Sequence, residues 1–425
     1  MKMWQTVYNI IVLPLVWICF QLLRTVDPKV RRGIRGRKRL FEILESKVAG
    51  LQQNRERIWF HSSSMGEFEQ AKPIIAELKK RDPSIEIVVT FFSPSGYEHS
   101  RNYKLADLIT YIPFDSRGNA RRFVELVHPS AAVMVRYDLW PNHLWALQQS
   151  KTPIFIANAT LRRNSARGFP MAKQFHRTLY DSLDYILTVS ESDKQMFESF
   201  NLSRPVVDVM GDTRYDQVWQ RSAESKTHHI LPAPVVTGRK ILVVGSSWQE
   251  DEEHLFPALK RLIAGRPDIL VILVPHEPTM ETLERIEFRL NGNISAIRFS
   301  ALGDYDGEHM IVIDSVGILM ALYQYAHVAY VGGSFRQGVH NVLEPAAYGI
   351  PLVIGPKHDN SQEALKLVAE GAAVVGTDEE ELYRHFRLLI EDDVIRRQAG
   401  QKALEFVRRN VGATLRFVSY LEKVL

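Results

Sequence analysis

The run VGGSFRQGVHNVLEPAAYGIPLVIGP, residues 331–356, carries the clearest fold signal in this 425-residue chain. Residues 328–331 and 351–354 are short apolar runs of strand length, and the segment between them opens with a Gly-Gly turn and contains a helix-forming stretch. Strand, turn, helix and strand make a βαβ unit, which builds a parallel sheet covered by helices. The run therefore predicts a Rossmann-like α/β domain.

The same run has the residue types of a nucleotide site. Gly332 and Gly333 follow the expected strand, where residues without side chains let a ligand approach the backbone. Asn341 and Glu344 are three residues apart at an expected helix start and so share a face. A glutamate there can accept both hydroxyls of a ribose. The alternative is an ordinary βαβ crossover in which Glu344 meets no ligand.

Similar apolar runs recur on both sides of this stretch and predict two domains. In the first half, strands are expected at 57–61, 85–91, 108–112, 131–135, 153–157 and 185–190. A second series begins at 240 with ILVVG and continues at 270–274, 310–313, 328–331, 351–354 and 373–375. Helical patterns such as 67–81 and 120–127 lie between them. We expect an N-terminal Rossmann-like domain at 25–225 and a second at 226–400, facing a cleft, with a helix at 401–425 that packs back on the first.

The N-terminus has the composition of a membrane anchor. Residues 3–23 contain no charged side chain, and about 20 apolar residues span a bilayer as a helix. Eight basic residues and one acidic residue follow at 24–39, a net charge of +7 that leaves −3 for the rest of the chain. The positive-inside rule then predicts an anchor at 1–24 with the domains in the cytoplasm. A spanning helix, an interfacial helix and a buried N-terminal helix all remain open.

The remaining composition narrows the class of protein. Because the positive charge is local, a general nucleic-acid binder is excluded. Cys19 is the one cysteine, so the sequence predicts neither a disulfide framework nor a cysteine metal site. The 14 histidines show no metal-ligand spacing, and we expect no metal and no cofactor.

The sequence HSSSMGE at 61–67 follows the first expected strand. Ser62, Ser63 and Ser64 form a turn whose backbone N–H groups can hold an oxyanion or a phosphate. Glu67 falls in the first helical turn, where a carboxylate can take a proton from an acceptor hydroxyl. The alternative is that Glu67 only complements the helix dipole, which also lowers its pKa, so burial would have to raise the pKa again.

Further polar residues follow other expected strands. In MVRYDLWPN, at 134–142, Arg136 and Asp138 end the fourth strand; Asp138 either supports Glu67 or an acceptor hydroxyl, or caps the next helix. In GSSWQEDEE, at 245–253, Ser246 and Ser247 can bind a phosphate or carboxylate, and His276 closes the next strand.

Taken together, these motifs resemble those of the 3-deoxy-D-manno-octulosonic acid (Kdo) transferases, GT-B-fold enzymes of lipopolysaccharide synthesis. The resemblance covers nearly the whole chain and rests on SMGE at 64–67, DLWPN at 138–142, Asn158-Ala159 with Leu161, GDTRYD at 211–216 and HNVLEP at 340–345. Asp138 takes the place of the second acid of the family's commoner Glu-Thr-Glu.

The resemblance implies roles for these residues. Glu67 is the expected general base and Asp138 its companion. CMP is expected against Ser246, Ser247, His276, Gly317, Gly332, Gly333, Ser334, Asn341 and Glu344. Arg136 and the serines at 62–64 are candidates for the Kdo carboxylate or the acceptor.

The implied reaction is inverting transfer of Kdo from CMP-Kdo to a lipid A precursor, lipid IVA, by an enzyme at the cytoplasmic side of the inner membrane. The expected partners are the donor, the lipid acceptor and inner-membrane lipids, and no nucleic acid. Two alternatives stand: another membrane-associated GT-B enzyme with a UDP-sugar donor, and a non-catalytic GT-B scaffold.

Overall fold

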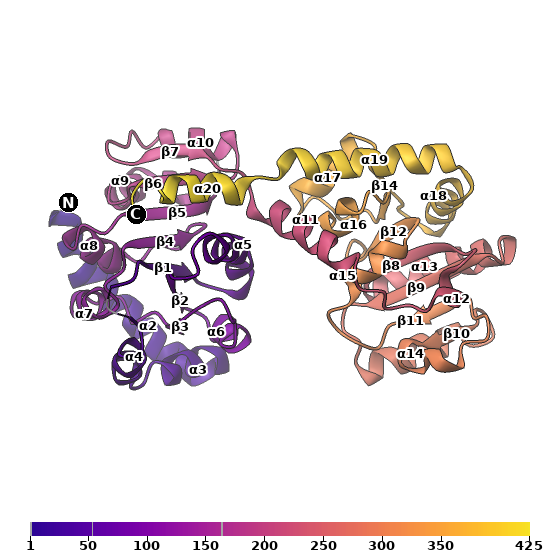
Figure 1. The fold of residues 1–425 in the computed structure, drawn as a ribbon, viewed down its shortest axis with the longest axis horizontal. Coiled ribbons are helices and arrows are strands. Elements are labelled where there is room, and N and C mark those ends of the chain that lie inside the picture. Colours follow the sequence, from indigo (N-terminus) through magenta and orange to yellow (C-terminus); the bar gives the residue numbers. More distant parts are fainter. Residues whose placement is uncertain (1, 53, 163–164) are drawn as a thin grey trace. The chain divides into compact units, whose positions relative to one another are not determined.

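The computed structural model describes residues 2–52, 54–162 and 165–425, and the chain forms two compact units (Figure 1). The first holds the chain up to Gln217 together with Val411–Leu425, and the second is Val218–Asn410. Each unit contains one seven-stranded sheet whose neighbouring strands all pair in parallel, flanked by helices. The expected architecture of two Rossmann-like domains is confirmed.

The first sheet has the order β3-β2-β1-β4-β5-β6-β7, so that β1, the first strand in the chain, lies inside the sheet between β2 and β4. Strands β1, β2, β4 and β5 are buried along their whole length, because helices cover both faces of a parallel sheet. The strands are β1 (Arg57–Ser62), β2 (Glu86–Phe91), β3 (Leu108–Tyr111), β4 (Ala131–Val135), β5 (Ile154–Ala159), β6 (Tyr185–Thr188) and β7 (Val206–Val209).

The second sheet has the order β10-β11-β9-β8-β12-β13-β14. Its strands are β8 (Lys240–Ser247), β9 (Ile269–Pro275), β10 (Ala296–Arg298), β11 (Met310–Val312), β12 (Val328–Val331), β13 (Leu352–Ile354) and β14 (Ala373–Val375). The quoted run 331–356 forms the expected βαβ unit between β12 and β13, which pair from Ala329↔Leu352 to Val331↔Ile354.

Two edge strands, β7 and β10, were not expected from the sequence. They stand at the ends of the two sheets. Each is four residues or fewer, and none of their residues is fully buried. An edge strand with one side open to solvent needs no continuous apolar run, so it lacks the signal that reveals the central strands.

The first unit carries the N-terminal helices. Residues 2–26 form one continuous helical segment: α1 (Lys2–Val7), a π-helical turn η1 (Tyr8–Val12) and α2 (Leu13–Val26). Asp27 then caps α3 (Pro28–Gly36), its Oδ1 accepting from Lys29 N at 2.7 Å. The other helices are α4 (Leu40–Val48), α5 (Met65–Arg81), α6 (Pro94–Ser100), α7 (Arg117–Val127), α8 (Pro141–Gln149), η2 (Ala166–Gly168), α9 (Pro170–Tyr180), α10 (Glu191–Glu198), α11 (Thr213–Ser225) and α20 (Ala413–Leu421).

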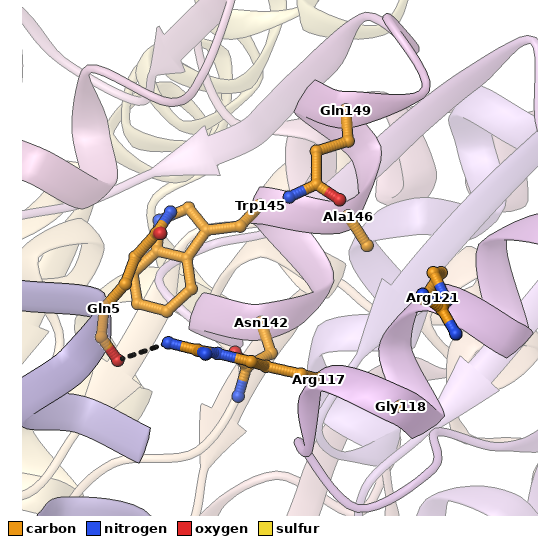
Figure 2. A pocket seen from close by; sticks show the side chains of 8 residues that line it. All are labelled: Gln5, Arg117, Gly118, Arg121, Asn142, Trp145, Ala146 and Gln149. Atoms are coloured by element: carbon orange, nitrogen blue, oxygen red, sulfur yellow. Dashed lines mark hydrogen bonds between the residues drawn. The ribbon is translucent and has the colours of Figure 1, made fainter. Parts of the chain in front are cut away.

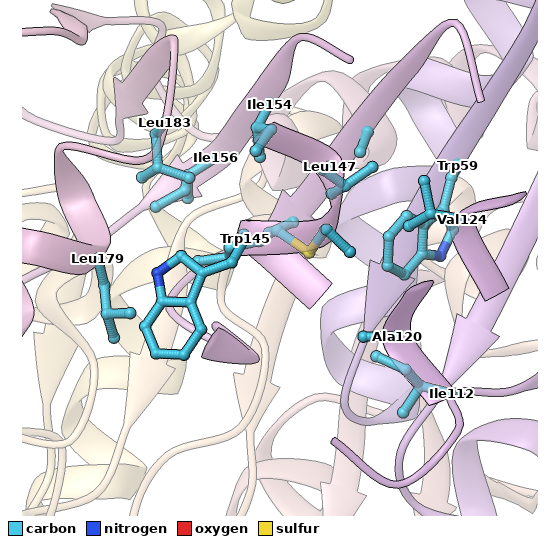
Figure 3. Close-up of a cluster of buried hydrophobic side chains, with 14 of the residues drawn as sticks. Trp59, Ile112, Ala120, Val124, Trp145, Leu147, Ile154, Ile156, Leu179 and Leu183 are labelled. Carbon is cyan, nitrogen blue, oxygen red and sulfur yellow. The ribbon is translucent and has the colours of Figure 1, made fainter. Parts of the chain in front are cut away.

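The helices of the first unit pack on both faces of its sheet. On one face, Trp59 and Ile156 of the sheet meet Val124 of α7 and Leu147 of α8 (Figure 3). On the other face, α5 and α20 form a second core with β1, β2 and β5, in which Phe68 and Phe417 are fully buried.

The second unit contains the remaining helices. These are α12 (Ala233–Val236), α13 (Gln249–Gly265), α14 (Met280–Leu290), η3 (Phe299–Asp304), α15 (Leu319–Leu322), η4 (Tyr323–Tyr325), α16 (Leu343–Ala347), α17 (Gln362–Ala369), α18 (Glu379–Glu391) and α19 (Asp393–Asn410). The prediction of a single helix from about 401 to 425 is wrong. Two helices, α19 and α20, cover this stretch, and they are separated at Gly412. Its φ of +108° lies in a region that favours glycine and that a helix cannot continue through.

Two motifs hold the chain where it passes between the units. The Asn158 side chain pairs with Thr213, donating to Thr213 Oγ1 at 2.9 Å and accepting from Thr213 N at 3.1 Å. Asp216 in α11 accepts from Gly412 N at 2.6 Å and from Thr414 N at 2.9 Å, so it caps α20. Asn158, Thr213 and Asp216, from two of the motifs quoted above, therefore stabilise the fold of the first unit.

Candidate active site

The turn between β1 and α5 places Glu67 at the carboxyl edge of the first sheet. Ser64 is the N-cap of α5 and forms a capping box with Glu67, whose Oε2 accepts from Ser64 N at 2.9 Å. Glu67 is only 6% exposed. The helix-terminal role that the sequence left open is therefore present.

The surroundings of Glu67 raise its pKa above the ordinary value. Burial is the main cause, and the negative charge of Asp138 adds to it. Backbone hydrogen bonds from Ser64 and Ser63 and the nearby His61 act in the opposite direction but do not cancel the effect. Burial thus outweighs the pKa-lowering contacts of the helix start, as a base at this position requires.

Asp138 lies at the centre of a hydrogen-bond cluster. Its Oδ2 is 2.9 Å from His61 Nε2 and accepts from Trp140 Nε1 at 3.1 Å and from the Ser63 hydroxyl. Burial alone raises the pKa of Asp138, but these hydrogen bonds outweigh it and lower the pKa below its ordinary value. Asp138 is therefore ionised beside Glu67, which keeps the pKa of Glu67 high.

The alternative role of Asp138 as a helix cap is wrong. Helix α8 begins at Pro141, and its N-cap residue Trp140 makes no side-chain cap. The free N–H groups of Asn142 and His143 go instead to Asp115, with distances of 3.2 and 3.1 Å.

His61 links Asp138 to the interior of the sheet and was not singled out from the sequence. Trp59 Nε1 donates to Thr90 Oγ1 at 2.8 Å, and the same hydroxyl lies 2.9 Å from His61 Nδ1. His61 Nε2 lies 2.9 Å from Asp138 Oδ2 and 3.0 Å from Trp140 Nε1. The fully buried His61 thus fixes the orientation of that carboxylate.

The two remaining candidates near this edge contain polar atoms without protein partners. Arg136 has a φ of +66°, rare for a residue with a side chain, and its N donates to Ala157 O at 2.8 Å. Within the described part of the chain, neither Arg136 Nε nor Ser62 Oγ has a hydrogen-bond partner, although both are buried. Buried donors of this kind are uncommon, and each can donate to an anion.

In the second unit, four of the expected donor residues line one pocket of about 320 Å³: Ser246, Gly317, Asn341 and Glu344. Asn341 Nδ2 donates to Glu344 Oε1 at 3.0 Å, which confirms that the two share a face. Burial raises the pKa of Glu344, while the hydrogen bond from Asn341 and the charge of Arg221 oppose that rise. Arg221, Tyr323 and His340 also line the pocket and were not expected.

A bulge in β8 shapes this pocket. The pairing of β8 with β9 shifts between Gly245 and Ser247, and Ser246 has a φ of +56°. Gly332 packs directly on the bulge: a Cβ at that position would lie 2.2 Å from Ser246 O. Glycine is therefore required at 332 by the fold of the pocket itself.

Three more of the expected donor residues are not among those that line this pocket and make hydrogen bonds within the second unit: Gly333, Ser334 and Ser247. Asp251, at the start of α13, accepts from Gly333 N at 2.7 Å and from the Tyr330 hydroxyl at 2.9 Å. Ser334 is fully buried, and its Oγ accepts from Gly355 N at 2.7 Å. The Ser247 hydroxyl donates to Glu252 at 3.1 Å. The acidic stretch at 250–253 held no residue that the sequence singled out, yet the buried Asp251 organises the glycine loop.

His276 stands in a stack of rings. It stacks on both Trp248 and His340, with ring centroids 4.5 and 4.4 Å away, and Trp248 Nε1 donates to His340 Nε2 at 2.7 Å. The Arg336 guanidinium covers Trp248 at 3.9 Å. In the described residues, no group of three or more His, Cys, Asp or Glu side chains is arranged to hold a metal ion.

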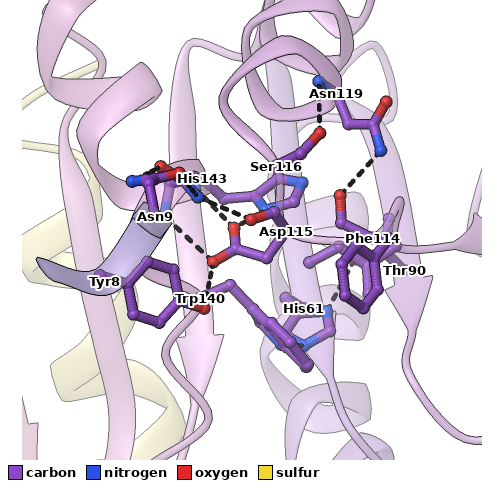
Figure 4. A network of polar contacts seen from close by, with 12 residues as sticks. Tyr8, Asn9, His61, Thr90, Phe114, Asp115, Ser116, Asn119, Trp140 and His143 are labelled. Atoms are coloured by element: carbon purple, nitrogen blue, oxygen red, sulfur yellow. Dashed lines mark hydrogen bonds and ion pairs between the residues drawn. The ribbon is translucent and has the colours of Figure 1, made fainter. Parts of the chain in front are cut away.

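The DLWPN motif also holds the N-terminal helix. Asp115 and His143 are fully buried, with Asp115 Oδ1 2.7 Å from His143 Nδ1. The Tyr8 hydroxyl donates to Asp115 Oδ2 at 2.8 Å, and the amides of Asn9 and Asn142 exchange two hydrogen bonds of 3.0 Å (Figure 4). The helix over Met3–Val26 is long and apolar enough to cross a membrane.

The fold and these residues define a class of protein before any comparison: two Rossmann-like units with a nucleotide-sized pocket in the second and an acidic cluster in the first, the GT-B architecture. Among solved structures, the UDP-GlcNAc 2-epimerases of Neisseria meningitidis and Methanocaldococcus jannaschii are similar in fold. Their TM-scores are 0.59 and 0.53, at 16% identity, over 87% and 84% of this chain and 100% and 99% of theirs.

Sequence comparison finds similarity to one family of transferases. Residues 36–217 match the family model of 3-deoxy-D-manno-octulosonic-acid transferase (kdotransferase). The 3-deoxy-D-manno-octulosonic acid transferase of Haemophilus influenzae is 25% identical over 100% of this chain and 99% of its own. That of Chlamydophila psittaci is 29% identical over 74% of this chain and 73% of its own. The chain is therefore similar to Kdo transferases, a class of glycosyltransferases, along most of its length and to their family model over residues 36–217.

Proposed function

We propose that this protein transfers Kdo from CMP-Kdo to a lipid A precursor, lipid IVA, with inversion at the anomeric carbon. The similarity to Kdo transferases supports Kdo as the group transferred. The observation that carries the chemistry is the buried Glu67, whose pKa is raised beside the ionised Asp138. A carboxylate with a raised pKa is a stronger base, and glycosyl transfer to a hydroxyl needs such a base.

In the proposed reaction, Glu67 takes the proton of an acceptor hydroxyl. The hydroxyl oxygen then bonds to the anomeric carbon of Kdo as the bond from that carbon to the CMP phosphate oxygen breaks, and CMP leaves with the electron pair. Ser64 N donates to Glu67 Oε2 at 2.9 Å and so fixes the orientation of the carboxylate that receives the proton. Arg136 Nε and Ser62 Oγ, buried without protein partners in the described chain, are our candidates for the Kdo carboxylate.

The pocket of the second unit is the proposed CMP site. Its volume of about 320 Å³ suits a nucleotide, and Glu344 can accept from both ribose hydroxyls. Asn341 fixes the Glu344 carboxylate at 3.0 Å. Ser246 and Gly317 line the same pocket, and we assign them to the nucleotide as well.

We further propose that the N-terminal helix lies along the cytoplasmic surface of the inner membrane. Between Tyr8 and Arg24 a helix rises about 24 Å, most of a hydrocarbon core of about 30 Å. A crossing helix with Arg24 at the cytoplasmic surface would carry Tyr8 to the far leaflet. Tyr8, however, donates to Asp115, in the unit that also carries Glu67.

The opposite face of the helix is free to enter lipid. The apolar side chains of Ile10, Leu15, Leu22 and Val26 are 57–75% exposed. Large exposed apolar surfaces of this kind mark sites of contact with a membrane or a partner. Arg24 and the basic residues of α3 follow directly, where they can meet anionic head groups.

The test is to incubate the full-length protein with CMP-Kdo and lipid IVA and to measure the mass of the lipid product. We expect the added mass of one or more Kdo residues and release of CMP. A parallel reaction with UDP-sugars tests the other enzyme class. Product from a UDP-sugar alone, or no product with any donor, would refute the proposal and favour one of the two alternatives.

A further inference from the structure

A second hollow of about 500 Å³ lies beside the N-terminal helix, in the unit that carries Glu67. It is enclosed by α2, α3 and the segments that follow β2 and β3. Its walls are largely apolar, with the side chains of Trp17, Phe20, Val30, Ile34, Phe92 and Phe114.

The hollow is built by specific contacts between the helix and the domain. Phe20 packs edge-on against Phe92 and Phe114, with ring centroids 5.7 and 6.4 Å away. Arg37 closes one side: its guanidinium donates to the carbonyls of Ile112, Gly33 and Phe92 at 2.8–2.9 Å. Because protein carbonyls occupy these donors, the wall at Arg37 offers little to a charged ligand and suits an apolar chain.

Positive charge stands at the border of this hollow. Lys29 is exposed and lines it, and α3 carries three further exposed basic residues, Arg31, Arg32 and Arg35. By contrast, the smaller hollow at the start of the helix, about 280 Å³, is lined by Gln5, Arg117, Arg121 and Gln149, and Arg117 reaches the Gln5 carbonyl across it (Figure 2). An apolar interior with a cationic border fits an amphiphile with an acyl chain and an anionic head.

The wall of the larger hollow is one residue away from the acidic cluster. Ser93 N donates to Ser63 O at 2.9 Å, in the turn that leads to Glu67. Phe92 packs on Trp140 with ring centroids 4.8 Å apart, and Trp140 Nε1 donates to Asp138. A molecule in the hollow therefore lies next to the proposed acceptor site.

We propose that this hollow binds one acyl chain of the lipid acceptor and so places the acceptor hydroxyl near Glu67. This inference rests on the proposed function, and it commits to the acceptor instead of a bulk membrane lipid because the wall contacts the acidic cluster. Each methylene of the chain that leaves water should strengthen binding about fourfold.

The first test fills the hollow. Val30→Trp puts a large ring into it, and Val26→Trp, at a side chain 75% exposed and outside the hollow, is the matched control. In detergent, with saturating CMP-Kdo, we expect Val30→Trp to raise KM for the acylated acceptor at least about tenfold. The rate with a deacylated acceptor that keeps its sugars and phosphates should not change. Equal KM values for both variants would overturn the inference.

The second test does not depend on turnover. The full-length protein is irradiated with an acceptor that carries a diazirine on one acyl chain, and labelled peptides are mapped by mass spectrometry. Labels at Trp17, Val30 or Phe92 that survive excess phosphatidylglycerol support the inference. Labels on Ile10, Leu15 or Leu22 alone, or labels lost to phosphatidylglycerol, overturn it. An absence of Kdo transfer with these labels present would refute only the proposed reaction.

Discussion

Replacing Glu67 by glutamine separates the two roles that the structure gives this residue. Glu67 Oε2 accepts from Ser64 N at 2.9 Å as part of the capping box of α5. The amide oxygen of glutamine can accept the same hydrogen bond, so the helix start is preserved. What the variant loses is the negative charge and the ability to take a proton.

The structure also predicts the effect on stability. Burial and the charge of Asp138 raise the pKa of Glu67 in the folded protein above its unfolded value. The folded state then binds this proton more tightly, so the contribution of Glu67 to stability is present at low pH and is lost as pH rises through the folded pKa. At pH 8 the wild type holds a buried charge and Glu67→Gln does not. We therefore expect the variant to be at least as stable at that pH.

Activity should behave in the opposite way. Loss of a general base costs about 10² to 10⁴ in rate, whereas loss of a helix cap costs only about 1 kcal/mol of stability. The wild-type rate should rise with pH through a pKa above that of an ordinary glutamate, because the base must be deprotonated.

The assay is single-turnover Kdo transfer with saturating CMP-Kdo from pH 5 to 9, together with denaturant unfolding at pH 8. The control is Glu77→Gln. Glu77 lies on the same helix, where it forms an ion pair with Arg81. If Glu67→Gln keeps more than about a tenth of the wild-type rate, the assignment of the base is refuted. Loss of rate accompanied by equal loss of folded protein would show that Glu67 acts only as a cap.

Three further outcomes are expected. Tyr8→Phe removes the 2.8 Å hydrogen bond to the buried Asp115 and should cost about 1.5–3 kcal/mol in docking of the N-terminal helix, measured as faster proteolysis of that helix in detergent. Gly332→Ala places a Cβ 2.2 Å from Ser246 O and should abolish CMP binding in calorimetry while the first unit stays folded. Glu344→Gln should weaken CMP binding about tenfold, and wild-type affinity should rise with pH through the raised pKa of Glu344; pH-independent affinity would contradict the ribose assignment.

The sequence was sufficient for the parts of the fold that are buried on both faces. Strands such as β4 and β9 are continuous apolar runs because helices cover both sides of a parallel sheet. The edge strands β7 and β10 are short and partly exposed, so their residues carry no such pattern. The division between α19 and α20 depends on one residue, Gly412, inside an otherwise helical stretch.

The candidate site divides in the same way. Glu344 and Asn341, or Ser64 and Glu67, are close in sequence, so their spacing on a helix predicts their contact. His61 and Asp138 are 77 residues apart, and Asp251 and Gly333 are 82 apart, so only the pairing of strands in the sheet brings them together.

By itself, the sequence determined two parallel sheets, the motifs at their carboxyl edges and an apolar N-terminal segment followed by positive charge, because each depends on residues near one another in the chain. The tertiary structure alone decided that Asp138 is ionised by its hydrogen bonds to His61, Ser63 and Trp140, since burial and charge depend on neighbours from other strands. It also decided that Tyr8 and Phe20 hold the N-terminal helix to the domain. Hydropathy measures how apolar a helix is, but it does not show which of its side chains contact the rest of the domain.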